Sequence, residues 1–220
     1  MKTLATLAVP FLLSASFAVP AVAQGGGGLY PYLQSLPIEA VDANEVFVLQ
    51  HMREEEKLAR DVYLVLHQTW QVPMFANIAQ SEQSHMDLVA WALTRYQIAD
   101  PVPSDTVGVF GTAEYTSLFQ FATTLGQISP AHALLVGALI EDLDIVDLDA
   151  SLGWSDNRDL DCIWQNLQRG SRNHLRAFYP QLASAGYVYP AFFLTPAELL
   201  AIVTTPTEPR PVDENGVPLF

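Results

Sequence analysis

Four stretches of the chain repeat apolar residues at spacings of three and four, the pattern of a helix that buries one face. The first predicted helix begins after Asp42, which forms a capping-box pattern with Glu45, and runs to about Trp70. The second covers about residues 75–96. Both are long enough to span a small domain, so the first half of the chain predicts a helical pair.

The second half repeats this organisation. A third predicted helix begins with Ser129 as its N-cap and Pro130 at its first position. A fourth begins after Ser155 or Asp156 and continues to about Phe178. No comparable stretch alternates with the period of two that a strand requires, so the pattern predicts an all-α fold.

Two shorter helices complete the prediction. Residues 99–127 contain several Pro and Gly residues and read as a long crossover, with a short helical pattern at 113–124. A last helix starts at Thr195, which is followed by Pro196 and, three residues after the cap, by Glu198. We therefore expect a four-helix bundle with a long crossover that carries a short helix, and a short C-terminal helix.

Polar residues interrupt the apolar stripe of every long helix near its middle. They are Glu56 in the first, Glu82 with His85 in the second, Glu141 in the third, and Ser171 with His174 in the fourth. A buried, unpaired carboxylate costs several kcal/mol or is forced to take a proton. If the helices pack antiparallel, the interruptions meet at one level of the core. A metal ion would convert this cost into coordination bonds, and carboxylates with imidazoles suit iron, manganese or zinc.

The spacing of Glu82 and His85 places both side chains on one helical face, as two donors to a single metal centre require. A Glu-x-x-His pair of this kind occurs in the di-metal bundles of ferritin-like proteins. We predict metal ligands at Glu56, Glu82, His85, Glu141 and His174. Cofactors consistent with this set are one or two ions of iron, with manganese or zinc as alternatives.

Each ligand also has a structural alternative. Glu56 would instead form a buried ion pair with Arg60 or with an arginine of the fourth helix. Glu141 would be one member of a charged face with its acidic neighbours, which are Asp142, Asp144 and Asp147. His174 would be a hydrogen-bonded core histidine. Glu54 and Glu55 are expected to be solvated, and three other histidines are expected to be structural or exposed: His51, His67 and His132.

The segment Glu56-Lys57-Leu58-Ala59-Arg60-Asp61-Val62-Tyr63 is similar to the first-helix pattern of rubrerythrin-type ferritin-like proteins. The segments 53–63, 77–86, 137–148 and 169–178 resemble the bacterial and archaeal family DUF2202, which is classed as ferritin-like. The resemblance covers about residues 43–202 and implies a ferritin-like four-helix bundle with a metal centre. It implies no activity, because that family is itself of unknown function.

One position departs from the ferritin-like pattern, which has a second Glu-x-x-His on the last helix. Here that helix reads Ser171-Arg172-Asn173-His174, so the sixth ligand is missing. The site would be asymmetric, completed by water, or occupied by one metal. We expect Asp144 to supply the missing carboxylate or to orient a histidine, and the Tyr63 hydroxyl to bond a ligand carboxylate.

The ends of the chain read differently from the predicted bundle at 36–203. Residues 1–23 have the form of a secretory signal peptide, residues 24–35 form a Gly-rich spacer, and residues 204–220 form a Pro-rich tail expected to be disordered. The signal predicts a periplasmic or secreted protein without membrane insertion after cleavage. The single cysteine, Cys162, cannot form an internal disulfide and is expected to be a buried, inert thiol.

A net charge of −14 argues against nucleic acid and anionic lipid as partners and favours cations. Three functions fit the sequence. The first is an iron-dependent oxidase or peroxidase acting on oxygen or peroxide; the second is an exported, non-catalytic protein that binds or sequesters metal. The third is an interaction module whose polar layer specifies the packing. The sequence does not decide the oligomeric state.

Overall fold

A computed structural model of the chain describes residues 28–219, so the predicted signal peptide at 1–23 lies outside the described residues. This part of the chain contains seven α-helices: α1 (Leu29–Ser35), α2 (Ala43–Trp70), α3 (Pro73–Arg95), α4 (Ala113–Gly126), α5 (Pro130–Trp154), α6 (Arg158–Ser184) and α7 (Pro196–Val203). Within it there is no strand, and extended pairing is limited to an isolated bridge between Val212 and Pro218. The predicted all-α class is confirmed.

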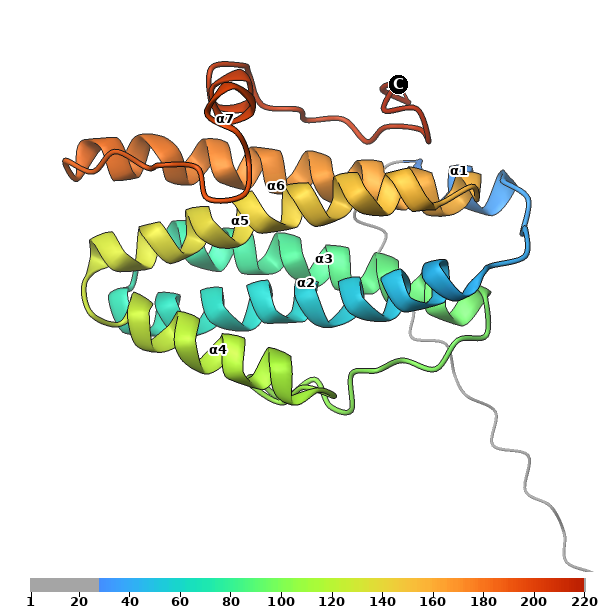
Figure 1. The fold of residues 1–220 in the computed structure, drawn as a ribbon, viewed down its shortest axis with the longest axis horizontal. Helices are drawn as coiled ribbons and strands as arrows, with labels where there is room; N and C mark the ends of the chain where they lie inside the picture. The colour runs from blue at the N-terminus through green and yellow to red at the C-terminus, as the bar shows by residue number, and fades with distance from the viewer. Residues whose placement is uncertain (1–27, 220) are drawn as a thin grey trace, which may run out of the picture.

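The four long helices form a bundle of two antiparallel pairs (Figure 1). α2 and α3 lie side by side, and α5 and α6 form a second layer against them. The connections within the pairs are short, residues 71–72 and 155–157. The chain passes between the pairs through the long crossover and α4, which packs on α2 and α5.

Local sequence fixes where the helices begin. The Asp42 carboxylate accepts hydrogen bonds from the backbone amides of Asn44 and Glu45, and the Glu45 carboxylate accepts one from the Asp42 amide, which completes the predicted capping box. Ser129 caps α5, and Thr195 with Glu198 forms a second capping box on α7. These caps satisfy amides that have no partner within the helix.

A polar layer divides the hydrophobic core into two clusters. One cluster contains Tyr63, Phe75 and Phe178, whose rings lie 5.7–6.2 Å apart. The other contains Met52 and Trp164 among its buried residues. Along α2, α3 and α6 the buried residues pass from one cluster to the other with the predicted polar interruptions between them. In α5, Glu141 lies between Ala138 and Ile145 of the first cluster.

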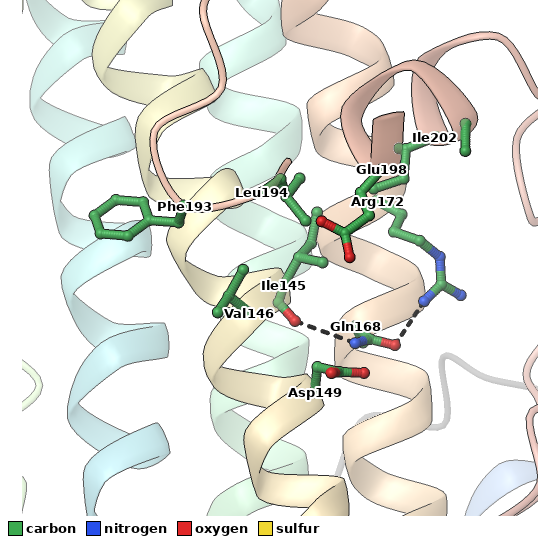
Figure 2. Close-up of a pocket in the computed structure, with 10 residues that line it drawn as sticks. Ile145, Val146, Asp149, Gln168, Arg172, Phe193, Leu194, Glu198 and Ile202 are labelled. Carbon is green, nitrogen blue, oxygen red and sulfur yellow. Dashed lines mark hydrogen bonds between the residues drawn. The ribbon is translucent and has the colours of Figure 1, made fainter. Parts of the chain in front are cut away.

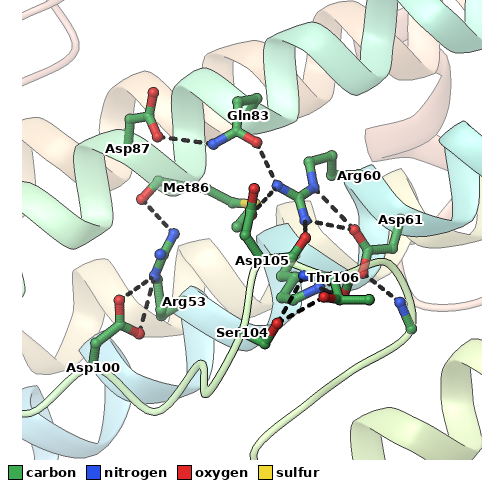
Figure 3. A network of polar contacts seen from close by, with 12 residues as sticks. Arg53, Arg60, Asp61, Gln83, Met86, Asp87, Asp100, Ser104, Asp105 and Thr106 are labelled. Carbon is green, nitrogen blue, oxygen red and sulfur yellow. Dashed lines mark hydrogen bonds and ion pairs between the residues drawn. The ribbon is translucent and has the colours of Figure 1, made fainter. Parts of the chain in front are cut away.

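The crossover is held to α2 by a buried ionic network (Figure 3). Lys57, which is fully buried, lies 2.5 Å from Asp61 and donates a hydrogen bond to the Thr106 carbonyl. Arg60 pairs with Asp61 and with Asp105, at 2.8 and 2.5 Å. Arg60 therefore pairs with these aspartates, which removes the alternative of a Glu56–Arg60 ion pair.

The two terminal segments differ from the sequence prediction. Part of the expected spacer, from Leu29 to Ser35, forms α1, whose Leu33 is fully buried in the cluster that contains Trp164. Apolar residues of this segment pack against the end of the bundle, and their burial stabilises the short helix.

The Pro-rich tail is ordered as far as residue 219 and follows α6 (Figure 1). Glu208 pairs with Arg172 and Arg176, each at 2.8 Å. The Val212 amide donates to the side chain of buried Asn166, and the Val212 carbonyl accepts from it. The expectation of disorder rested on composition alone, and these polar groups of α6 supply partners that composition does not reveal.

Among the helices of residues 28–219, none combines the length of a membrane span with a sufficiently apolar sequence.

Asp142 anchors the segment that joins α6 to α7, and it is fully buried. Its carboxylate accepts hydrogen bonds from the Tyr189 hydroxyl and from the amides of Phe192 and Leu194, at 2.7–2.8 Å. The expected charged face is thus not formed by this residue, because the α6–α7 segment covers it.

We predict that Asp142→Ala lowers the free energy of unfolding by about 2–3 kcal/mol, since it leaves several buried donors without a partner. Urea denaturation followed by circular dichroism measures the change. Asp149→Ala, at an exposed position of the same helix, is the control and should be nearly neutral. Equal effects of the two substitutions would contradict the anchoring role.

Candidate metal centre

The structure brings the five predicted ligands together in the polar layer. α2 contributes Glu56, α3 contributes Glu82 and His85, α5 contributes Glu141, and α6 contributes His174. None of these residues is more than 8% exposed. Their ligand atoms form two groups, each within 4.8 Å: Glu56 with Glu82 and His85, and Glu82 with Glu141 and His174.

Glu82 belongs to both groups and lies between the two imidazoles. One of its carboxylate oxygens lies 2.7 Å from Nδ1 of His85, and the other lies 2.8 Å from Nδ1 of His174. The outer carboxylates complete the line: Glu56 lies 3.1 Å from His85 Nδ1, and Glu141 lies 3.2 Å from His174 Nδ1. Each Nδ1 atom therefore faces two carboxylate oxygens.

Protons alone do not satisfy this arrangement. A ring nitrogen carries at most one proton, and the favourable hydrogen-bond geometry directs His85 to Glu56 and His174 to Glu141. Glu82 Oε1 is left without a hydrogen-bond partner despite its 2.8 Å distance from His174, and Glu56 Oε1 also lacks one. Buried, unpartnered carboxylate oxygens beside imidazole nitrogens fit a metal ion, which accepts several donors at once.

Two further contacts orient these groups. Nε2 of His174 lies 2.9 Å from the Ser81 hydroxyl, which can accept the Nε2 proton and leave Nδ1 free as a ligand atom. The Tyr63 hydroxyl donates to Glu141 and lies at 3.3 Å from the Gly137 carbonyl. Tyr63 thus bonds a predicted ligand carboxylate, whereas the contribution of Ser81 was not predicted.

Ser171 and Asp144 meet beside this centre. The Ser171 hydroxyl donates to one oxygen of Asp144, and the other oxygen is buried without a partner. Asp144 does not belong to either group of converging ligand atoms, and it makes no hydrogen bond to a histidine. The short serine of α6 leaves space that a side chain from α5 enters, so Asp144 adds a further carboxyl group next to the centre.

The electrostatics reflect crowded carboxylates around two imidazoles. Burial raises the pKa of Glu56 to about 7, against the opposing effect of His85. Burial also raises the pKa of Asp144 well above its usual value, and the charges of Glu56, Glu55 and Glu141 add to this.

Glu82 behaves in the opposite way. Burial alone would raise its pKa, but His174 and His85 outweigh burial and hold the pKa below its usual range. The same pairing acts on the imidazoles: burial favours their neutral form, yet the adjacent carboxylates raise the pKa of His174 to about 10 and that of His85 well above 6.5. Without a metal, both histidines are therefore in the protonated, positively charged form at neutral pH.

The sequence prediction placed Glu54 and Glu55 in solvent, and the structure corrects this. Glu54 is buried and accepts hydrogen bonds from the amides of Gly111 and Thr112, at 2.7 and 3.1 Å. Glu55 is only 6% exposed. The reason is that α4 and the segment before it cover a face of α2 that a bare four-helix bundle would leave in water.

A surface hollow of about 390 Å³ between α5, α6 and α7 is a separate feature (Figure 2). Gln168 bridges it by donating to the Ile145 carbonyl and accepting from Arg172. None of the predicted ligands lines this hollow, so we do not assign the candidate site to it.

Gly170 creates the space that His85 occupies. A Cβ atom at this position would lie 2.4 Å from both Cε1 and Nε2 of the imidazole. Glycine at this point of α6 therefore lets the His85 ring pack directly against the helix backbone.

We predict that Gly170→Ala displaces His85 and lowers the free energy of unfolding by about 1–3 kcal/mol, the usual cost of overpacking. Chemical denaturation measures this change. The control is Gly153→Ala in α5, where an added Cβ meets nothing within 4 Å. The control should be neutral or stabilising by up to about 1 kcal/mol, as expected for alanine in a helix. A Gly170 variant as stable as the control would refute the packing argument.

The raised pKa values also predict how the metal-free protein responds to pH. His174 holds its proton more tightly in the folded state, so it stabilises the fold fully below its usual pKa of 6.5, and this contribution is lost as pH rises toward about 10. Glu56 acts in the same direction between about pH 4.5 and about pH 7.

We therefore expect the melting temperature of the chelator-treated protein to fall by roughly 5 °C or more between about pH 6 and about pH 10. Thermal denaturation at constant ionic strength tests this. His174→Gln should flatten the upper part of the profile. Constant or increasing stability over this range would contradict the electrostatic description.

Comparisons with known proteins agree with this fold. Residues 45–206 match the family described as "Uncharacterized protein domain (DUF2202)". The uncharacterized protein MJ0754 of Methanocaldococcus jannaschii is 44% identical over 177 residues, which cover 80% of this chain and 96% of that protein. A crystal structure of hypothetical protein MJ0754 from Methanococcus jannaschii superposes with a TM-score of 0.78 at 44% identity, covering 79% of this chain and 99% of that one. The chain belongs to the DUF2202 family.

Proposed function

We propose that this protein is a ferritin-like four-helix bundle whose polar layer binds one or two metal ions. The ligands would be Glu56, Glu82, His85, Glu141 and His174. The observation that carries the proposal is the position of Glu82 between two imidazole nitrogens, at 2.7 and 2.8 Å. A carboxylate shared by two groups of ligand atoms suits either one ion on one side or two ions that share Glu82.

The donor set favours iron, with manganese and zinc as alternatives, because carboxylate oxygen and imidazole nitrogen are suitable ligands for all three. Because only five protein ligands are proposed, one coordination position of the metal would remain open for an oxidant. Iron bound there would supply redox chemistry toward oxygen or peroxide. The protein's own residues would contribute burial, which excludes bulk water, and the Tyr63 hydroxyl, which holds Glu141 in place.

A non-catalytic role in metal binding or sequestration is the alternative, and it uses the same ligands. The predicted signal peptide at 1–23 leads us to propose that either role is performed in the periplasm or outside the cell. The unpartnered carboxylate oxygens favour metal binding over a polar layer that only specifies packing, since such a layer should satisfy its own hydrogen bonds.

Metal reconstitution tests the centre. We predict that the purified protein, stripped with chelator and incubated with ferrous iron without oxygen, retains one or two ions per chain after desalting. Glu82→Ala/His85→Ala should lose this metal because it removes the shared carboxylate and one imidazole. Elemental analysis gives the stoichiometry. The control, His67→Ala/Glu114→Ala, removes the same residue types outside the polar layer and should retain the metal.

The two roles separate when the ferrous protein is mixed with oxygen or peroxide in a stopped-flow instrument. Oxidation within seconds, lost in the Glu82→Ala/His85→Ala variant, would favour an oxidase or peroxidase. Iron that stays ferrous for minutes would favour the binding role. Full metal retention in that variant, or no bound metal in the reconstituted parent protein, would refute the proposed centre.

A further inference from the structure

A second group of converging ligand atoms lies outside the centre described above. His51 and Glu55 are one turn apart on α2, and Asp147 faces them from α5. One ligand atom from each lies within 4.8 Å of the others. His51 Nε2 and Glu55 Oε2 are 3.3 Å apart. An imidazole and two carboxylates are therefore brought together by two helices that are far apart in sequence.

Glu55 is a buried carboxylate with one oxygen available to bind a metal ion. Its side chain is only 7% exposed, yet Oε2, the oxygen that faces His51, has no hydrogen-bond partner. Leaving a buried carboxylate oxygen unpaired is unfavourable unless another charge compensates it. Asp147 brings a second carboxylate to this position from α5. The position thus attracts a cation.

His51 is held with Nε2 directed at this oxygen. The Tyr115 hydroxyl donates to the His51 carbonyl at 3.2 Å and lies 2.9 Å from Nδ1, where it can accept the Nδ1 proton. The Phe47 ring stacks on the imidazole, with centroids 5.6 Å apart. An acceptor on Nδ1 fixes the tautomer in which Nε2 carries a free electron pair, as in most histidine metal sites.

Solvent reaches this group, unlike the core centre. The His51 side chain is 35% exposed, and Asp147 is partly buried. A cation bound here would keep water molecules in its remaining positions. The imidazole favours a first-row transition cation or zinc over calcium or magnesium, which prefer oxygen ligands alone.

We propose that His51, Glu55 and Asp147 form a second divalent-cation site near the surface of the bundle. The site uses none of the ligands of the proposed core centre, so it can exist whether or not that centre binds iron. It also gives a role to His51 and Glu55, which the sequence analysis placed among structural or exposed residues.

Zinc binding provides the test. In the full chain carrying Glu82→Ala/His85→Ala, which disables the core centre, we expect equilibrium dialysis to detect a bound Zn²⁺. Adding His51→Gln or Asp147→Asn should weaken this binding by about 10-fold or more. The matched controls are His132→Gln and Asp149→Asn, which lie outside the group and should leave the binding unchanged.

Chemical modification gives a readout that does not depend on stoichiometry. Diethyl pyrocarbonate should modify His51, and Zn²⁺ should slow this reaction about 10-fold or more in the parent chain but not in the Asp147→Asn variant. Mass spectrometry of the peptide that contains His51 follows the reaction, and circular dichroism verifies folding. Unchanged Zn²⁺ affinity in the His51 and Asp147 variants, or no protection of His51, would refute the site.

Discussion

The burial of several carboxylates and two imidazoles in one layer of the core is the constraint on which the rest of the structure depends. A purely apolar bundle would tolerate small shifts of one helix along another. Here each histidine must reach two carboxylates from different helices, so the four long helices are aligned at one level. The apolar clusters on either side of the layer supply the hydrophobic stabilisation that offsets its desolvation.

The residues around this layer bury it and hold other charged side chains away from it. Two cationic side chains close to it on α2, Lys57 and Arg60, pair with Asp61 and the crossover, so they do not neutralise the carboxylates. The carboxyl groups of the layer are therefore paired with its two imidazoles rather than with Lys or Arg. Tyr63, Ser81 and Gly170 then fix the orientation of individual ligands by a hydrogen bond or by leaving space.

Much of the fold could be predicted from sequence because its signals are local. Periodic apolar residues, the Asp42 capping box and the Ser129–Pro130 start of α5 define helix limits close to those of the structure. Sequence was less informative where several partners surround one helix. The burial of Ala133 and Val136 at the start of α5 does not follow from one apolar stripe, because α5 is apolar on most sides and α4 also packs on it. The burial of Glu54 and Glu55 has the same origin, and no periodicity within α2 reveals it.

The C-terminal tail packs on the bundle beyond the end of the family match. The match to the family ends at residue 206, whereas Glu208 and Val212 bond to the outer face of α6, and Glu214 accepts a hydrogen bond from Tyr32 of α1. The two ends of the described chain thereby meet across the start of α6, where Arg158 also pairs with Glu214. A fragment cut at the family boundary would leave three arginines of α6 without the Glu208 groups that they now bond, so the part of this chain that packs on the bundle extends beyond the family match.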